Sequence, residues 1–118
     1  MPYKYIIDSE ANMVTVLLKA ECTFGHCVEA IIDLKDNPDY RDDMKIFVNA
    51  LEMEIKPSIL EITSLANIFM SLKDQYSEVR VLPAPHLGKA VEIFTSLINR
   101  TGTKVRFIMF EDEIKDWL

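Results

Sequence analysis

The chain has 118 residues, of which 49% are apolar and 27% are charged, and its formal net charge is −6. This size and composition predict one globular domain with a single hydrophobic core, covering residues 1–118. The acidic balance argues against nucleic acid as a partner, because phosphate backbones attract basic surfaces, and against anionic membrane surfaces. No apolar run is long enough to span a bilayer and no signal peptide opens the chain, so we expect a cytoplasmic protein.

The first third of the chain predicts a hairpin followed by a helix. Residues 3–7 and 13–18 have the composition of strands, and the polar stretch 8–12 between them has the composition of a turn. Thr23 is a candidate N-cap, and apolar residues then recur at helical spacing to about Asp36. Asn37-Pro38 ends this helix, because a residue before proline is pushed out of helical geometry.

A short apolar segment, residues 44–49, predicts a strand covered on both faces, in the middle of the sheet. Pro57 and Ser58 then predict the start of a helix running to about Asp74, since proline suits the first helical turn. Ser58 and Glu61 have the spacing of a capping box.

The last third predicts a strand at 79–82, then a helix from Pro85 to Asn99 with Gly102 as a turn residue. A strand at 104–110 and a terminal helix at 112–118 complete the chain. The element order is therefore ββαβαβαβα. Strands that alternate with helices predict an α/β fold, with a mixed five-stranded sheet whose core strands are parallel.

This order resembles that of STAS domains, and more closely that of the bacterial SpoIIAA-like family, also described as STAS/SEC14-like. The resemblance covers nearly the whole chain. Three stretches carry it: Asn37-Pro38-Asp39-Tyr40 followed by Met44, Leu87-Gly88-Lys89-Ala90 with Phe94, and the ending from Phe110-Glu111-Asp112 to Asp116-Trp117-Leu118. The resemblance implies a fold rather than an activity, since one fold hosts many functions.

STAS domains of the anti-sigma-factor-antagonist type carry an Asp at the end of the central strand and, nine residues later, a Ser that a partner kinase phosphorylates. In this chain Asn49 stands where that Asp would be, and Ser58 is nine residues further on. Pro57 replaces the Asp that usually precedes the serine. Ser58 is therefore the one position of this motif that the chain matches. It is either a phosphate acceptor or a capping residue.

A second candidate site lies where loops follow the parallel strands, because ligands of open α/β sheets bind at that edge. Lys56, His86 and Lys89 would meet two helix amino ends there, an arrangement suited to a small anion. The alternative is that these are ordinary surface charges. The loop Leu51-Glu52-Met53-Glu54-Ile55 alternates apolar and acidic residues, so Leu51, Met53 and Ile55 form either an exposed contact patch or a small extension of the core.

Motifs of catalysis and metal binding are missing from the sequence. Cys22, His26 and Cys27 lie close together but lack a second ligand pair, and Cys27 falls on an apolar helical stripe, where it reads as a small buried hydrophobe. No nucleophile elbow, phosphate-binding glycine loop or H-E-x-x-H pattern occurs. We therefore expect no enzymatic activity, cofactor, metal site or disulfide framework.

Two functions follow as predictions. The first is a non-enzymatic regulatory or protein-interaction module that acts through the face of loop 50–58 and self-associates, for example as a homodimer. The face would comprise Asn49, Leu51, Met53, Ile55, Lys56, Ser58, His86 and Lys89. The alternative, implied by the SEC14-like resemblance, is a carrier of a small apolar or anionic, lipid-like ligand held between helices and sheet.

Overall fold

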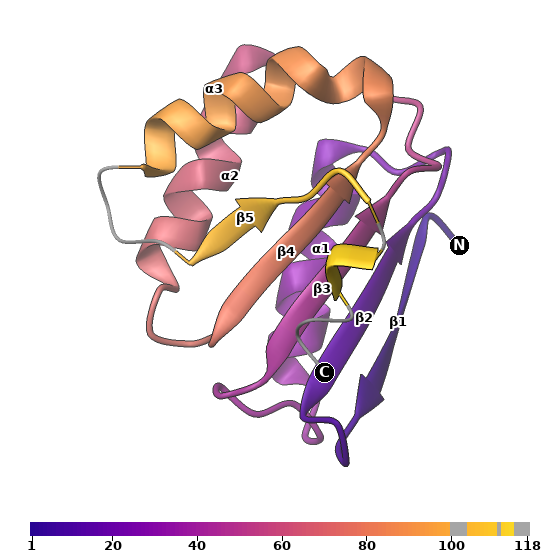
Figure 1. Ribbon diagram of the computed structural model, residues 1–118, viewed down its shortest axis with the longest axis vertical. Coiled ribbons are helices and arrows are strands. Elements are labelled where there is room, and N and C mark those ends of the chain that lie inside the picture. The colour runs from indigo at the N-terminus through magenta and orange to yellow at the C-terminus, as the bar shows by residue number, and fades with distance from the viewer. Residues whose placement is uncertain (100–103, 111, 115–118) are drawn as a thin grey trace.

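The computed structural model describes residues 1–99, 104–110 and 112–114. These residues form five strands, three α-helices, the 3-10 helix η1 and a 3-10 turn near the end of the chain (Figure 1). In chain order the elements are β1 (Tyr3–Asp8), β2 (Met13–Leu18), α1 (Phe24–Asp36), β3 (Lys45–Ala50), α2 (Ile59–Ser71), β4 (Glu78–Pro83), the 3-10 helix η1 (Pro85–Leu87), α3 (Gly88–Ile98) and β5 (Val105–Phe107).

The strands form one mixed sheet in which the order in space is the order along the chain, β1 to β5. β1 pairs antiparallel with β2, and the three later pairs are parallel. β3 therefore lies mid-sheet and α2 follows it, which confirms the α/β fold and the central position predicted for residues 44–49. With this order, right-handed crossovers place the connecting helices on one face of the sheet. In Figure 1, α1 passes behind the strands and the C-terminal turn lies in front of them.

The hairpin between β1 and β2 closes through polar side chains, as expected for residues 8–12. Asp8 pairs with Met13, and its Oδ1 accepts hydrogen bonds of 3.1 Å from the backbone N–H groups of Glu10 and Ala11. Asn12 has a φ of 55°, in the left-handed region that asparagine tolerates better than most residues other than glycine.

The main core lies between the helices and one face of the sheet. Alternate strand residues such as Val14 and Val79, both with no exposed surface, pack there with residues from the three helices. Phe94 of α3 makes edge-to-face contacts with Phe69 of α2 and Phe107 of β5, with ring centroids 6.0 and 5.5 Å apart. Full burial of one large apolar side chain stabilises a fold by roughly 1.5–3 kcal/mol, so this layer provides most of the stability.

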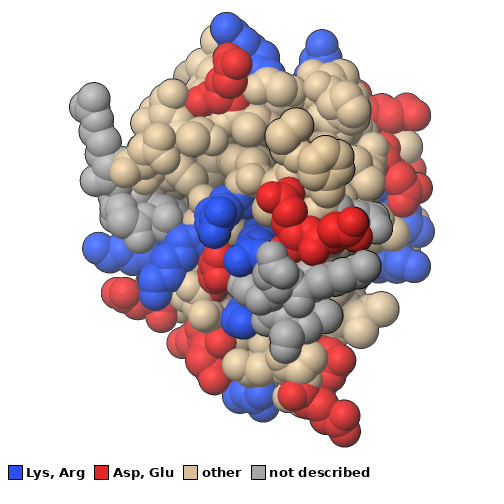
Figure 2. Space-filling model, viewed as in Figure 1, with Lys and Arg blue, Asp and Glu red and all other residues tan. Residues whose placement is uncertain are grey.

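The opposite face of the sheet carries a second, smaller apolar cluster. Met13, Phe47, Leu82 and Ile108 form it, and Ile114 packs against it. Because side chains alternate along a strand, Lys45, Arg80 and Arg106 lie on this face beside the cluster. Figure 2 shows basic side chains gathered near its centre, next to acidic ones.

The end of the chain departs from the prediction. We expected a strand at 104–110, but β5 stops at Phe107. Ile108 still donates to the carbonyl of Val81 at 2.9 Å, whereas the next two N–H groups, of Met109 and Phe110, donate to the carboxylate of Glu113 at 2.7 and 3.0 Å. These two bonds turn the chain back across the sheet. Residues 112–114 form one 3-10 turn, and the rest of the predicted helix 112–118, like Gly102, lies outside the described residues.

Two other boundaries are corrected. α2 ends at Ser71 rather than near Asp74, because the N–H of Gln75 donates to the carbonyl of Leu72 and closes a turn there. The helix predicted from Pro85 begins as η1 and becomes α3 at Gly88. Within the described part of the chain, no helix has both the length and the apolar character needed to cross a membrane.

Candidate functional site

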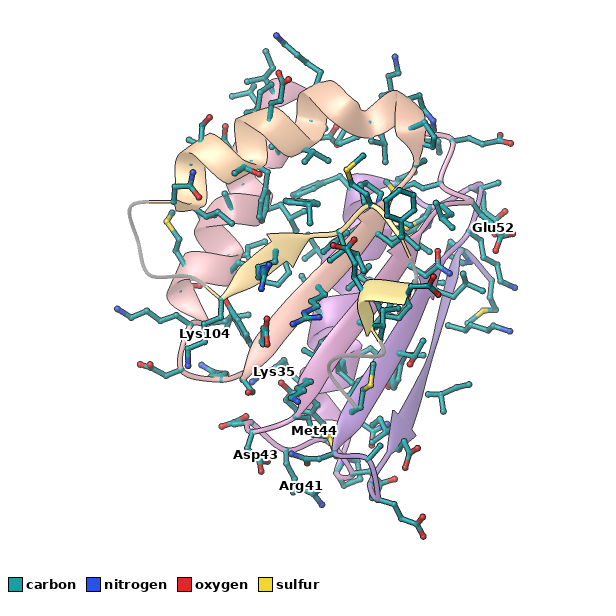
Figure 3. The ribbon with its side chains drawn as sticks, in the orientation of Figure 1. Lys35, Arg41, Asp43, Met44, Glu52 and Lys104 are labelled. Carbon is teal, nitrogen blue, oxygen red and sulfur yellow. The ribbon has the colours of Figure 1, made fainter. Side chains whose placement is uncertain are left out.

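The predicted site residues lie along one edge of the sheet. Strands β2 to β5 are parallel, so the loops that follow them emerge at the same edge. Asn49 is near the end of β3, Lys56 and Ser58 precede α2, and His86 and Lys89 follow β4. Figure 3 shows Glu52 of the loop after β3 at this edge, and Lys35 and Met44 toward the opposite one.

The loop that joins β3 to α2 divides its apolar residues between the surface and the core. Leu51 and Ile55 are 43% and 41% exposed, whereas Met53 is 6% exposed and belongs to the main core. The N–H of Leu51 donates to Oδ1 of Asn49 at 3.1 Å and that of Met53 donates to the carbonyl of Ala50 at 3.2 Å. This turn points Met53 inward. Met53 therefore extends the core, while Leu51 and Ile55 are exposed and their role as a contact patch stays a prediction.

Ser58 is the N-cap of α2. Its Oγ accepts from the N–H of Glu61 at 3.2 Å, and its own N–H donates to Oε1 of Glu61 at 2.8 Å, so the predicted capping box is formed. The hydroxyl is used structurally, although the residue itself is exposed. Lys56, His86 and Lys89 are also exposed, as expected for surface charges as well as for an anion site.

The sequence did not predict the exposure of the first turn of α2. Ile59 and Leu60 are 66% and 80% exposed, immediately after the capping serine. With Leu51 and Ile55 they place four large apolar side chains on the loop and helix start at this edge. We call these four residues the apolar edge. Glu52 and Glu54, both exposed, lie between them in the chain.

A cavity lies between the three helices and the sheet, with a volume of about 190 Å³. It is partly open, and its walls are almost entirely apolar. Its floor includes Val48, Val81 and Phe107 from the sheet. Its other walls include Cys27 and Ile31 of α1, Ile62 and Leu65 of α2, and Ala90 and Phe94 of α3.

The cavity explains an unusual burial pattern. Val48 and Val81 are neighbours on the central strands β3 and β4 and face the helices, yet both are only half-buried. By contrast, Val14 on β2 faces the same layer with no exposed surface. The sequence signal for the cavity is the small size of Ala30, Ala90, Val48 and Val81, all of which line it.

Polar groups occur at the two ends of the cavity. Glu61 lines the end near the start of α2, and Lys35, Tyr40 and Gln75 line the end near the amino ends of the strands. Nζ of Lys35 contacts Oδ1 of Asp42 at 3.3 Å and the carbonyl of Gln75 at 3.1 Å, and it lies 5.1 Å from the centre of the Tyr40 ring. The ammonium group of Lys35 therefore places a positive charge at this end of the cavity.

The tyrosines at this end are held neutral. Tyr40 donates to the carbonyl of Gln75 at 2.8 Å, and burial together with the nearby Asp42 and Asp43 raises its pKa to about 12. Tyr76 donates to the carbonyl of Phe69 at 3.3 Å, and burial raises its pKa to about 12. Both hydroxyls act as donors over the whole physiological pH range.

Cys27 is less buried than its place on an apolar helical stripe predicted. Cys27 is half-buried and lines the cavity, whereas Cys22 has no exposed surface. Both are free thiols, with sulfur atoms 3.7 Å apart. Among residues 1–99, 104–110 and 112–114, no three His, Cys, Asp or Glu side chains come together in a way that could hold a metal ion.

Searches with protein-family models, among curated proteins and among solved structures found no match to this chain. The resemblance to the SpoIIAA-like family therefore stays a prediction based on the element order and the three sequence stretches.

Proposed function

We propose that this protein is a non-enzymatic carrier that binds a small apolar molecule in the cavity between its helices and its sheet. The supporting observation is the apolar lining of a cavity of about 190 Å³ above the central strands. A dry cavity of about 150 Å³ in another protein binds benzene or xenon, so this one has room for a ligand of that size or slightly larger.

The cost of leaving the cavity empty supports the proposal. Protein interiors are packed as densely as organic crystals, with few voids larger than a water molecule. At roughly 24 cal/mol per Å³, an enclosed empty cavity of this volume would cost on the order of 4–5 kcal/mol, which is the upper bound for this partly open one. This cost is a large part of the unfolding free energy of a typical domain, which is about 5–15 kcal/mol. A ligand would recover much of this loss through contacts with Val48, Val81 and Leu65.

The polar ends of the cavity restrict the ligand further. The apolar walls favour a hydrocarbon or aromatic body. Lys35 is the basic side chain among the described residues that line the cavity, so an acidic group at one end of the ligand would meet a cation. A short fatty acid or an aromatic acid fits both conditions.

Native mass spectrometry of protein purified without denaturation tests this function. We expect a retained small molecule, or binding of a small aromatic acid such as benzoate to the emptied protein, measured by calorimetry. Val48→Phe should fill the cavity and abolish binding, while Ile6→Phe, at a site on β1 that is 65% exposed, should leave binding unchanged. Absence of a retained mass together with absence of benzoate binding to the wild type would overturn the proposal.

A second candidate is the regulatory or interaction module of the STAS-like type, with self-association through the apolar edge. Leu51, Ile55, Ile59 and Leu60 favour it, because clustered exposed apolar side chains mark interaction surfaces. Light scattering and a pull-down from a native extract test it. Leu60→Lys should disrupt the assembly, while Ile32→Lys, at a site on α1 that is 56% exposed, should not. A strict monomer that captures no partner would count against this candidate.

A further inference from the structure

Cys22 and Cys27 bring their sulfur atoms to 3.7 Å at the start of α1. Thr23 is the N-cap of this helix, so Cys22 precedes the cap and Cys27 is the fourth helical residue. These are the two positions that an apolar pair occupies in a hydrophobic staple, where one side chain packs on the other across the helix start. In this chain both members of the pair are thiols.

The backbone around the two cysteines holds this geometry. Oγ1 of Thr23 accepts from the N–H of His26 at 3.3 Å, and Nδ1 of His26 accepts from the N–H of Thr23 at 3.1 Å, which closes a capping box. The N–H of Cys27 donates to the carbonyl of Thr23, and the N–H of Cys22 donates to the carbonyl of Lys19, both at 3.0 Å. Each thiol therefore sits on a backbone segment fixed by its own hydrogen bonds.

The two thiols are also chemically unequal. Their hydrogen bond lowers the pKa of Cys22 and, together with burial, raises the pKa of Cys27. Cys22 is thus the thiol that ionises more readily, and the thiolate is the reactive form of cysteine. Cys22 has no exposed surface, but its neighbour Cys27 lines the partly open cavity, which gives a small oxidant a route to the pair.

We propose that Cys22 and Cys27 are a redox modification site that forms a reversible intramolecular disulfide with a small peroxide as oxidant. In the balanced step the two thiols give up two protons and two electrons, hydrogen peroxide takes them up to become two water molecules, and one S–S bond forms. Formation of the disulfide requires the sulfur atoms to approach from 3.7 Å to about 2.05 Å.

The disulfide would join the loop after β2 covalently to the first turn of α1. Because Cys27 lines the cavity, oxidation would also change one wall of it. This proposal rests on the distance between the two sulfur atoms and not on the proposed function of the cavity.

The reduced full-length protein treated with hydrogen peroxide tests the proposal. We expect a monomer that has lost the mass of two hydrogen atoms, that no longer reacts with iodoacetamide after unfolding in guanidinium, and that regains both thiols with dithiothreitol. Peptide mapping should recover a peptide linked through Cys22 and Cys27. The oxidised monomer should also melt at a higher temperature than the reduced one, since a cross-link restricts the unfolded chain.

Cys22→Ser and Cys27→Ser are matched controls, and neither variant should lose two hydrogen atoms as a monomer. The wild-type reaction decides the question even if one variant fails to fold. Two thiols that remain alkylatable after peroxide, a disulfide-linked dimer, or stable sulfinic acid at one cysteine would each overturn the proposal.

Discussion

The guanidinium of Arg80 donates a hydrogen bond of 2.6 Å from Nη1 to the backbone carbonyl oxygen of Glu113. Arg80 belongs to the central part of the sheet and Glu113 to the segment that crosses its helix-free face. The same arginine lies 3.4 Å from the carboxylate of Glu78. This bond and the packing of Ile114 tie residues 112–114 to the face of the sheet opposite α1, α2 and α3.

Acid should loosen this segment. The pKa of Glu113 lies below its usual value, because its carboxylate accepts hydrogen bonds from the N–H groups of Phe110 and Met109 and faces Arg106 and Arg80. A carboxyl whose pKa is lowered by folding stabilises the folded state above its unfolded pKa, and this contribution is lost as the pH falls through the folded pKa. We therefore expect the amide NMR signals of Met109 and Phe110 to shift below about pH 4.5.

Glu113→Gln is the control for this titration. It removes the ionisable group, so the acid shift of the two amide signals should disappear, while signals from β2 should behave as in the wild type. Unchanged titration of Met109 and Phe110 in Glu113→Gln would show that another group controls the segment.

Adding one methylene group should have opposite effects at two valines that face the same helices. Val48→Ile would extend into the cavity, so we expect stabilisation by about 0.8 kcal/mol, the value of one buried methylene. Val14→Ile would enlarge a side chain that has no free space, and overpacking costs about 1–3 kcal/mol. Urea denaturation of both variants measures the difference. Destabilisation of equal size at both positions would mean that the space above Val48 is not available.

The capping serine of α2 should be replaceable by aspartate but not by alanine. Ser58→Ala removes the acceptor for the N–H of Glu61 and should cost about 1 kcal/mol of unfolding free energy. Ser58→Asp keeps an acceptor at the N-cap and should stay within about 0.5 kcal/mol of the wild type, because aspartate and serine are similar caps. Thr23→Ala provides the matched case at α1. Equal losses in both Ser58 variants would assign the role of this residue to something other than capping.

Alkaline conditions should destabilise the fold through its buried tyrosines. Tyr40 and Tyr76 have pKa values raised from 10.0 to about 12, so the folded state keeps protons that the unfolded state releases. The unfolding free energy should therefore fall as the pH rises from about 10 to about 12. Tyrosinate absorbance should show three groups, Tyr3, Tyr40 and Tyr76, that titrate above pH 10, because burial also raises the pKa of Tyr3. Tyr40→Phe should remove one of them. Titration of every tyrosine near pH 10 would contradict the burial of these hydroxyls.

Local signals explain what could be predicted. Helix starts at Thr23 and Ser58 depend on residues within one turn, and both appear where the side-chain pattern placed them. The short apolar run at residues 44–49 similarly predicted β3 and its central position. The prediction of a strand at residues 108–110 was wrong because it used composition alone. Two of the N–H groups that would pair with a neighbouring strand instead donate to the carboxylate of Glu113.

The sequence by itself determined the α/β class, the mixed sheet and the two capped helices, because these follow from interactions between residues close together in the chain. Only the tertiary structure decided that Met53 turns inward while Leu51 stays exposed, that a cavity opens above Val48 and Val81, and that two thiols lie 3.7 Å apart. The cavity depends on how closely the helices approach the sheet, whereas the positions of Met53 and of the two thiols depend on turns whose geometry the residue types alone did not specify. The distance between helices and sheet is set by all the side chains packed between them, and no short stretch of sequence encodes it.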